Sequence, residues 1–396
     1  MTRATSYEYV IVGGGSAGCV VAGRLAKAGR EVLLLEAGDD PSDHPETFRA
    51  DGYKDAFLND RLMWERFTTP QPGCAHRPLW IGTGTGLGGS GSVNGMVYTR
   101  GGRADYADWP RGWQWDDLVP SFEALEKVLR PNRRGPTPFT EAFIDAAERA
   151  GFRRSHDLND GDLAGVLGYE WMSYEGDQRR SSYVSFLFGA DLPTLTVETG
   201  ARVTRILTQG GAAIAVEYRI GNDLHCAAAT EEVVLAAGAL ETPKLLMLSG
   251  IGPADELQAQ GVDVVLDAPE VGKNLHDHPN VSMFHLGRRS VGTYYPQVYG
   301  FHRANPESTH IKDGAPDTCY VLYPAPSSFR EAAKRMAPTL ALPPGLHGKS
   351  WARNGFRGLL SLGLDNPLAG PAIDRLWGIV VILGKPKSRG LLRLRS

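Results

Sequence analysis

The sequence is poor in cysteine and contains no long apolar run. Its 396 residues include only four cysteines, Cys19, Cys74, Cys226 and Cys319, which are widely spaced and form no CxxC pair. This spacing contains no metal-binding or redox motif, so we expect reduced thiols and no metal site. No stretch reaches the ~18 apolar residues of a membrane-spanning helix, and the first twelve residues lack the apolar core of a signal peptide. We therefore expect a soluble, cytoplasmic protein.

The sequence also lacks an excess of charge of either sign. Its 42 Lys and Arg residues nearly balance 45 Asp and Glu residues, for a net charge of −3. This balance gives no electrostatic reason to expect a nucleic acid as partner. Glycine, in contrast, is abundant, with 48 of 396 residues, about 12% against a usual ~7%. Without a collagen-like period, this excess belongs in turns and in loops that approach a ligand closely.

The first forty residues predict a strand, a glycine turn, a helix and a second strand. Residues 9–12 and 31–36 are short apolar runs typical of strands buried on both faces. Between them, residues 16–28 have helical composition, and Gly29 is placed to end the helix. The sequence therefore predicts one βαβ unit.

The turn in this unit, GGGSAG at residues 13–18, fits the dinucleotide-binding pattern GxGxxG. In that pattern Gly13 permits the tight turn, Gly15 lets the backbone approach a pyrophosphate, and Gly18 lets the helix pack on the strand. The helix N-terminus supplies free N–H groups for the phosphates. Glu36 ends the second strand, where it would accept hydrogen bonds from ribose hydroxyls. An acid there argues against NADP, but the turn alone does not separate FAD from NAD.

Two further motifs follow. Residues 82–106 are dense in glycine but carry interleaved apolar residues, which indicates a loop lying against something large and flat rather than disorder. Residues 235–253 predict a strand, a glycine turn at Gly238 and a helix over 242–249, and the chain continues to NLHDHP at 274–279.

The remaining pattern predicts a few more elements. Helices are expected over 115–129 and 140–150, and strands over 195–198, 201–208 and 231–237. Beyond His276 the pattern weakens: 304–317 and 337–349 are expected as loops. Residues 377–383 and 391–395 are expected to form a hairpin around PKSRG.

Taken together, the motifs resemble those of the glucose–methanol–choline (GMC) oxidoreductases, FAD-dependent enzymes that oxidise alcohols. One family signature resembles residues 84–101 and a second resembles 238–252. The resemblance implies an α/β fold with a Rossmann-like FAD-binding domain, discontinuous over 1–155 and 196–283. A second, α+β substrate-binding domain on an antiparallel sheet would cover 156–195 and 284–396 and be incomplete at its C-terminus.

The resemblance also implies an FAD site. Asn94, Gly95 and Met96 would lie along the flavin and its ribityl chain, and Val203 would lie near the adenine. Val93 stands where some members carry a histidine that links FAD covalently, so we expect FAD to be bound non-covalently. The expected FAD-binding residues are Gly13, Gly15, Ser16, Ala17, Gly18, Glu36, Ala37, Gly88, Gly89, Asn94, Gly95, Met96, Val97, Val203 and Gly238.

The catalytic histidine of the family is expected beyond Ser396, so we expect no catalytic residue in this chain. His276 and His278 belong to a motif that is structural in the family. The 391–395 strand would form an open sheet edge, and the isolated chain would bind FAD poorly and be inactive. A polypeptide that complements the C-terminal part is one candidate partner.

The implied reaction transfers a hydride from an alcohol carbon to flavin N5 and gives an aldehyde or ketone. Oxygen, a quinone or another carrier would then accept the electrons. Two alternatives stay open: a flavin-containing lyase of the same fold, and a non-enzymatic fragment. The sequence does not name the alcohol.

Overall fold

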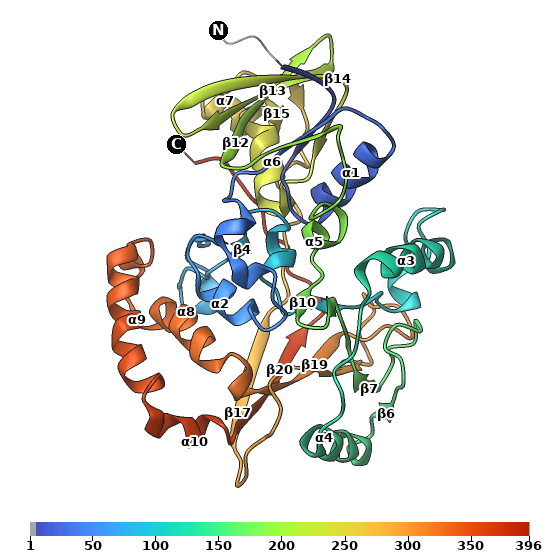
Figure 1. The fold of residues 1–396 in the computed structure, drawn as a ribbon, viewed down its shortest axis with the longest axis vertical. Coiled ribbons are helices and arrows are strands. Elements are labelled where there is room, and N and C mark those ends of the chain that lie inside the picture. The colour runs from blue at the N-terminus through green and yellow to red at the C-terminus, as the bar shows by residue number, and fades with distance from the viewer. Residues whose placement is uncertain (1–4, 396) are drawn as a thin grey trace.

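The computed structural model describes residues 5–395 as two six-stranded sheets with helices packed around them (Figure 1). The first sheet has the order β11-β2-β1-β14-β13-β12. Its first four strands are mutually parallel, and β13 and β12 continue it as antiparallel strands. The bounds are β1 (Thr5–Val12), β2 (Val32–Leu35), β11 (Leu195–Glu198), β12 (Ala201–Gln209), β13 (Ala212–Ile220) and β14 (Asp223–Leu235).

The centre of this sheet is buried on both faces, as the apolar runs predict. All four residues of β2 are buried, and they alternate between two apolar clusters. Leu33 and Leu35 pack with β12–β14, whereas Val32 and Leu34 pack with α1 (Ser16–Lys27) on the other face. Gly29, at φ +79°, follows the end of α1. The predicted βαβ unit is therefore confirmed.

The second sheet has the order β17-β20-β19-β18-β7-β6 and is antiparallel apart from the β6–β7 pair. One face packs on α4 (Pro138–Arg149), where Ile144 contacts Leu167 and Val298 in a buried cluster. The bounds are β6 (Arg153–Arg154), β7 (Val166–Tyr169), β17 (Asn280–Leu286), β18 (Val298–His302), β19 (Thr318–Pro324) and β20 (Leu376–Leu383).

The other elements connect or cover the two sheets. The helices are α2 (Tyr53–Leu58), α3 (Trp115–Leu129), α5 (Ser182–Phe186), α6 (Gly238–Leu248), α7 (Ala254–Ala259), α8 (Phe329–Ala341), α9 (Ser350–Leu364) and α10 (Gly370–Ile373). The short strands are β3 (Met63–Trp64), β4 (Thr83–Gly84), β5 (Val97–Tyr98), β8 (Trp171–Met172), β9 (Tyr174–Glu175), β10 (Gln178–Arg179), β15 (Ile251–Gly252) and β16 (Leu266–Asp267). No helix within residues 5–395 combines the length and apolar character needed to cross a bilayer.

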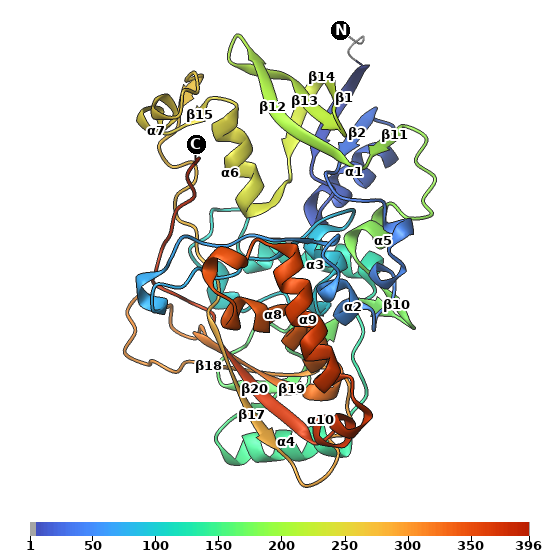
Figure 2. The same cartoon turned by 90° about the vertical axis from the view of Figure 1, so that its left-hand side faces the viewer.

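Helices α8 and α9 depart from the sequence prediction. They pack side by side near α2 (Figure 2). Neither helix was expected, and α8 takes up residues 337–341 of the loop expected over 337–349, whereas 342–349 are irregular as expected. Two arginines of α9, Arg353 and Arg357, point inward, and Leu359 and Leu362 are exposed. This inverted pattern hides α9 from an analysis of apolar periodicity. Inward-pointing arginines of both helices form ion pairs. Arg335 of α8 and Arg357 of α9 bind Asp60, and Arg335 also binds Glu65.

The expected hairpin of residues 377–383 with 391–395 is wrong. Strand β20 lies between β17 and β19, so both of its edges are already paired. The chain after PKSRG instead runs toward α7 (Figure 1). There Gly390 and Leu275 exchange two hydrogen bonds (2.6 and 3.0 Å), and Leu392 N donates to Gly272 O at 2.7 Å. The exposed edge of the second sheet is therefore β17, not residues 391–395.

Candidate functional site

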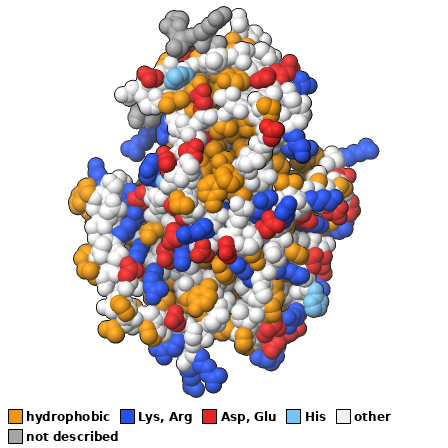
Figure 3. All heavy atoms as spheres, in the orientation of Figure 1, with side chains coloured by type: hydrophobic (Ala, Val, Ile, Leu, Met, Phe, Trp, Pro, Cys, Tyr) orange, Lys and Arg blue, Asp and Glu red, His pale blue; other side chains and the backbone are white. Residues whose placement is uncertain are grey.

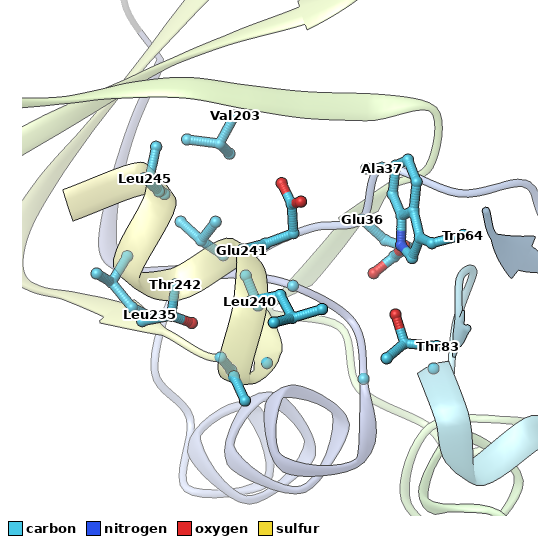
Figure 4. Close-up of a pocket in the computed structure, with 18 of the residues that line it drawn as sticks. Glu36, Ala37, Trp64, Thr83, Val203, Leu235, Leu240, Glu241, Thr242 and Leu245 are labelled. Carbon is cyan, nitrogen blue, oxygen red and sulfur yellow. The ribbon is translucent and has the colours of Figure 1, made fainter. Parts of the chain in front are cut away.

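The main cavity lies where the parallel strands of the first sheet end. It has a volume of about 710 Å³, and its wall includes the carboxyl-terminal residues of β1, β2 and β14. The opposite wall is α6, and residues of β3, β4 and β12 complete it (Figure 4). In open α/β sheets, ligands bind outside the carboxyl ends of the strands. The volume also falls in the range of cofactor sites.

The glycine turn forms the floor of this cavity. Gly13 has φ +100°, a left-handed conformation that side chains disfavour. A Cβ on Gly18 would lie 1.9 Å from Gly13 O, so α1 can approach β1 this closely only with glycine there. A Cβ on Gly15, in contrast, would meet only Ala236 O at 3.9 Å. The turn therefore leaves room at Gly15 for a ligand.

The N-terminus of α1 faces the cavity, and no acidic side chain of its first turn neutralises the partial positive charge of the helix dipole there. Gly15 is the N-cap residue, no side chain caps the helix, and the first turn contains no acidic residue. Ser16 and Ala17 line the cavity. Free N–H groups and the positive end of the helix dipole at this position favour an anionic group such as a phosphate.

Glu36 is held by backbone amides. Its Oε2 accepts a hydrogen bond from Gly14 N at 2.7 Å, and its Oε1 accepts from Gly38 N and Gly86 N at 2.8 and 3.0 Å. Burial raises the pKa of this carboxyl group, and the backbone hydrogen bonds oppose that rise. Glu36 therefore joins the glycine turn to the glycine-rich loop, a connection that the sequence did not reveal, while it still lines the cavity (Figure 4).

The mouth of the cavity carries charged and aromatic side chains. Arg66 Nη2 lies 2.7 Å from Glu241 Oε1, which joins the segment after β3 to α6. The guanidinium carbons of Arg66 and Arg202 lie 4.7 and 4.9 Å from the ring centroid of Trp64. Hydrophobic side chains gather in the upper middle of the molecular face, where Figure 1 places α6 (Figure 3). The sequence analysis missed Trp64, Arg66 and Arg202, because they stand in no recognisable motif.

A second, smaller cavity of about 110 Å³ lies beside the first. The two share Ser16, and the second is also lined by Asn94, Met96, Val97 and Arg179. The glycine-rich loop that separates them is docked on the turn, since Gly88 N donates to Gly14 O at 2.7 Å. Arg179 was not expected from the sequence.

The structure thus brings the expected site residues together in two groups. The main cavity is lined by Gly13, Gly15, Ser16, Ala17, Glu36, Ala37, Gly89, Val203 and Gly238, and the smaller one by Ser16, Asn94, Met96 and Val97. Gly18, Gly88 and Gly95 line neither cavity. Gly18 and Gly88 instead hold the turn and the loop in place. His276 and His278 are exposed and line neither cavity.

A parallel sheet whose first strand feeds a glycine turn and a helix N-terminus, with a cavity at its strand ends, defines the class with a Rossmann-like dinucleotide-binding domain. Within that class, the chain belongs to the GMC oxidoreductases: the family model described as "GMC oxidoreductase" matches residues 7–280. This confirms the resemblance seen in the motifs.

Two curated relatives show the extent of the similarity. An oxygen-dependent choline dehydrogenase of Photobacterium profundum is 36% identical over 300 residues, which cover 70% of this chain and 52% of that protein. An alcohol dehydrogenase [acceptor] of Pseudomonas putida is 37% identical over 302 residues, 70% of this chain and 54% of that protein. The chain spans about half the length of the curated relatives it matches.

Solved structures extend the similarity of fold to nearly the whole chain. Pyridoxine 4-oxidase from Mesorbium loti matches with a TM-score of 0.79 and 27% identity, over 98% of this chain and 73% of that one. A formate oxidase variant from Aspergillus oryzae, in which FAD modification was studied, matches with a TM-score of 0.78. It is 24% identical and covers 100% of this chain and 76% of its own, so it supports the fold alone.

Proposed function

We propose that this chain binds FAD as part of an oxidoreductase that acts on the CH–OH group of a small alcohol. The observation that carries the proposal is the main cavity formed by the glycine turn, Glu36 and α6 at the strand ends of a GMC fold. The relatives named for choline and alcohol support a small alcohol as substrate. Their names also support an external electron acceptor, for which we propose oxygen or a quinone-type carrier.

The residues of the two cavities fit an extended dinucleotide. The N-terminus of α1, at Ser16 and Ala17, would hold the pyrophosphate, and Val203 would border the adenine. Asn94, Met96 and Val97, which line the smaller cavity, would border the flavin. The fit rests on the open space at Gly15 and on the lack of an acid in the first turn of α1.

We propose that FAD is bound non-covalently. Val93, at the position of the linking histidine in some family members, is buried against Ala56, Leu62 and Met63. A valine side chain offers no nucleophile for a covalent bond. When bound, FAD supplies the hydride acceptor at N5.

The residues of this chain would bind and orient rather than transfer the alcohol proton. The α1 N-terminus would neutralise phosphate charge, and the Asn94–Met96 loop would set the plane of the flavin. None of the chain's histidines is proposed as the base. We propose that the base comes from sequence that matches the other half of the relatives, and that residues 1–396 by themselves are inactive.

The proposal keeps the two domains expected from the sequence, with FAD bound by residues 1–155 and 196–283 and substrate by 156–195 and 284–396. The strands of the first sheet all fall within 5–35 and 195–235, which supports the discontinuous first domain. Most of the second sheet falls within 280–383, which supports the second.

A substitution at Gly15 tests the cofactor site. The backbone of Gly15 (φ −72°, ψ −165°) suits any residue, and its Cβ points into open space. Gly15→Val therefore keeps the fold and fills the cavity. We expect the wild-type chain to quench the fluorescence of added FAD, and Gly15→Val to lose at least about tenfold in affinity with unchanged thermal unfolding.

Gly348→Val is the matched control, because a Cβ at Gly348 meets nothing within 4 Å and Gly348 lies outside the cavity. It is expected to bind FAD like the wild type. Wild-type chain that leaves FAD fluorescence unchanged, or a Gly15→Val variant of undiminished affinity, would refute the proposed site.

A further inference from the structure

We propose that Arg179 is a positioning residue of the flavin site. Its side chain holds Asn94 in place and puts behind Asn94 a positive charge that is not paired with a carboxylate. The inference rests on the proposed FAD site and adds to it a residue from outside the recognised motifs. Arg179 acts through Asn94 and is not itself proposed to touch the alcohol.

The hydrogen bonds of Arg179 converge on the glycine-rich loop. Arg179 lies on β10 and its side chain is fully buried. Its Nη1 donates to Asn94 Oδ1 at 2.9 Å and to Gly91 O at 3.0 Å, and its Nη2 donates to Asn94 O at 2.7 Å. The planar fork of the guanidinium thus binds two oxygens of one residue, which fixes both its backbone and its side chain.

Asn94 passes this constraint to the next residues of the loop. Its Oδ1 also accepts a hydrogen bond from Met96 N at 2.9 Å. Met96 is buried at φ +63°, an unfavourable conformation for a residue with a side chain. The strained turn at Met96 is therefore held by Asn94, and Asn94 is held by Arg179. This turn lines the smaller cavity, where the flavin is proposed to lie.

The charge of Arg179 has no counter-ion in the described part of the chain. Among residues 5–395, no carboxylate oxygen lies within 4.0 Å of its guanidinium, and its buried Nε has no hydrogen-bond partner. Burial lowers its pKa to about 10, which leaves it protonated at neutral pH. An uncompensated buried cation is costly to a fold.

This cost is offset if the cation faces negative charge when the site is in use. A flavin gains negative charge when it accepts a hydride, and a fixed cation beside the smaller cavity would stabilise that charge. A purely structural role in packing β10 against the loop would need the hydrogen bonds but not the unpaired charge.

Three variants separate these roles. Arg179→Met removes the fork and the charge, and Arg179→Lys keeps the charge but not the fork. Arg303→Met is the matched control, since the guanidinium of Arg303 also donates to loop carbonyl oxygens, those of Ser308 and Lys312 (both 2.8 Å), but Arg303 lines neither cavity. Circular dichroism first establishes that each variant is folded.

The first readout needs no cofactor. Amide hydrogen exchange of residues 94–96 in the ligand-free chain is expected to rise at least about tenfold in Arg179→Met, because hydrogen bonds to a charged group are lost. Arg303→Met is expected to leave it unchanged. Equal exchange in wild type and Arg179→Met would overturn the positioning role.

The second readout is the affinity of the FAD-loaded chain for sulfite. The sulfur lone pair of sulfite forms a bond to flavin N5, and negative charge moves onto the ring, so tight binding reports a stabilising positive charge. We expect the sulfite Kd to rise at least about tenfold in Arg179→Met and to stay within about threefold of wild type in Arg179→Lys and Arg303→Met. Unchanged sulfite affinity in Arg179→Met, or an equal loss in Arg303→Met, would overturn the electrostatic role.

The two proposals fail separately. Wild-type chain that binds no FAD refutes the proposed function, and the exchange measurement still decides whether Arg179 positions the loop. If Arg179→Met does not fold, Arg179→Lys and Asn94→Ala replace it. Each removes part of the same contact, so exchange at residues 95 and 96 must rise in both for the positioning role to stand.

Discussion

A Cβ atom on Gly18 would lie 1.9 Å from the carbonyl oxygen of Gly13, on the other side of the glycine turn. That oxygen belongs to backbone and cannot move without breaking the turn. We expect Gly18→Ala to destabilise the chain by about 1–3 kcal/mol, the usual range for overpacking a core, and to lower the urea midpoint of unfolding.

The control for this substitution is Gly355→Ala. Gly355 lies inside α9, and a Cβ there meets nothing within 4 Å. The change is expected to stabilise the chain by about 0.5–1 kcal/mol. A Gly18→Ala variant as stable as the wild type would show that α1 does not need its close approach to β1.

Glu170 gives the chain a dependence of stability on pH. The side chain is buried, its Oε2 has no hydrogen-bond partner, and burial raises its pKa from 4.5 to about 8. The folded chain therefore keeps a proton that the unfolded chain loses between these values, so stability falls as pH rises from 4.5 to 8. The slope is at most about 1.4 kcal/mol per pH unit for one proton.

Glu170→Gln removes this titration and keeps the shape of the side chain. Urea unfolding at pH 5, 7 and 9 is expected to show that the variant gains stability relative to wild type as pH rises. Parallel stability curves for the two proteins across this range would contradict the assignment.

The pair of Arg66 and Glu241 is expected to stabilise the mouth of the cavity. Burial would raise the pKa of Glu241, but Lys244 and Arg66 together hold that pKa below its ordinary value. The stabilisation that the ion pair contributes is therefore lost as pH falls through the lowered pKa of Glu241. A double-mutant cycle of Arg66→Met and Glu241→Gln is expected to give a coupling free energy of about 1 kcal/mol. Because both side chains are partly exposed, 1 M NaCl is expected to reduce it. A coupling of zero at low salt would show that the contact has no energetic weight.

Asp60 is expected to be essential for docking α8 and α9. Removing its charge leaves Arg335, Arg353 and Arg357 with Glu65 as the remaining carboxylate of the cluster. We expect Asp60→Asn to cost about 3 kcal/mol, toward the lower end for breaking buried pairs, because the Asp60 side chain is 32% exposed. Hydrogen exchange should rise first in α8 and α9.

Asp55→Asn provides the comparison, since Asp55 pairs with Arg49 at the surface, where both side chains are about half exposed. Its cost should stay below about 1 kcal/mol. Equal costs for the two variants would indicate that the arginine cluster is no more than a surface feature.

The elements that the sequence predicted correctly are those whose pattern depends on residues close together in the chain. The βαβ unit has a buried apolar run on each side of a glycine turn, and these residues interact with near neighbours in the chain. The same holds for α3 and α4, found over residues 115–129 and 138–149 as expected over 115–129 and 140–150. Glycine spacing and the family resemblance then identified nine of the 27 residues that line the main cavity.

The failures concern partners that are far apart in the sequence. The inward arginines of α9 are stable only because Asp60 and Glu65, some 290 residues earlier, receive them. In residues 391–395 apolar and charged side chains largely alternate, a pattern that suits any extended segment. Only the contacts with Gly272 and Leu275 decide where this segment lies. Arg179 was missed because nothing next to it in the sequence shows that its oxygen partners are those of Asn94.

The construction of the main cavity sets the order in which the chain becomes able to hold a ligand during its synthesis. The cavity residues of β1, the glycine turn and the end of β2 are complete at Ala37, whereas those of α6 are complete only at Leu245, 208 residues later (245 − 37). At about 5–20 residues per second, a ribosome needs roughly 10–40 s for that interval. Until then the nascent chain exposes the glycine turn without the opposite wall that α6 forms. The main cavity is therefore complete only in a chain whose first 245 residues have left the exit tunnel.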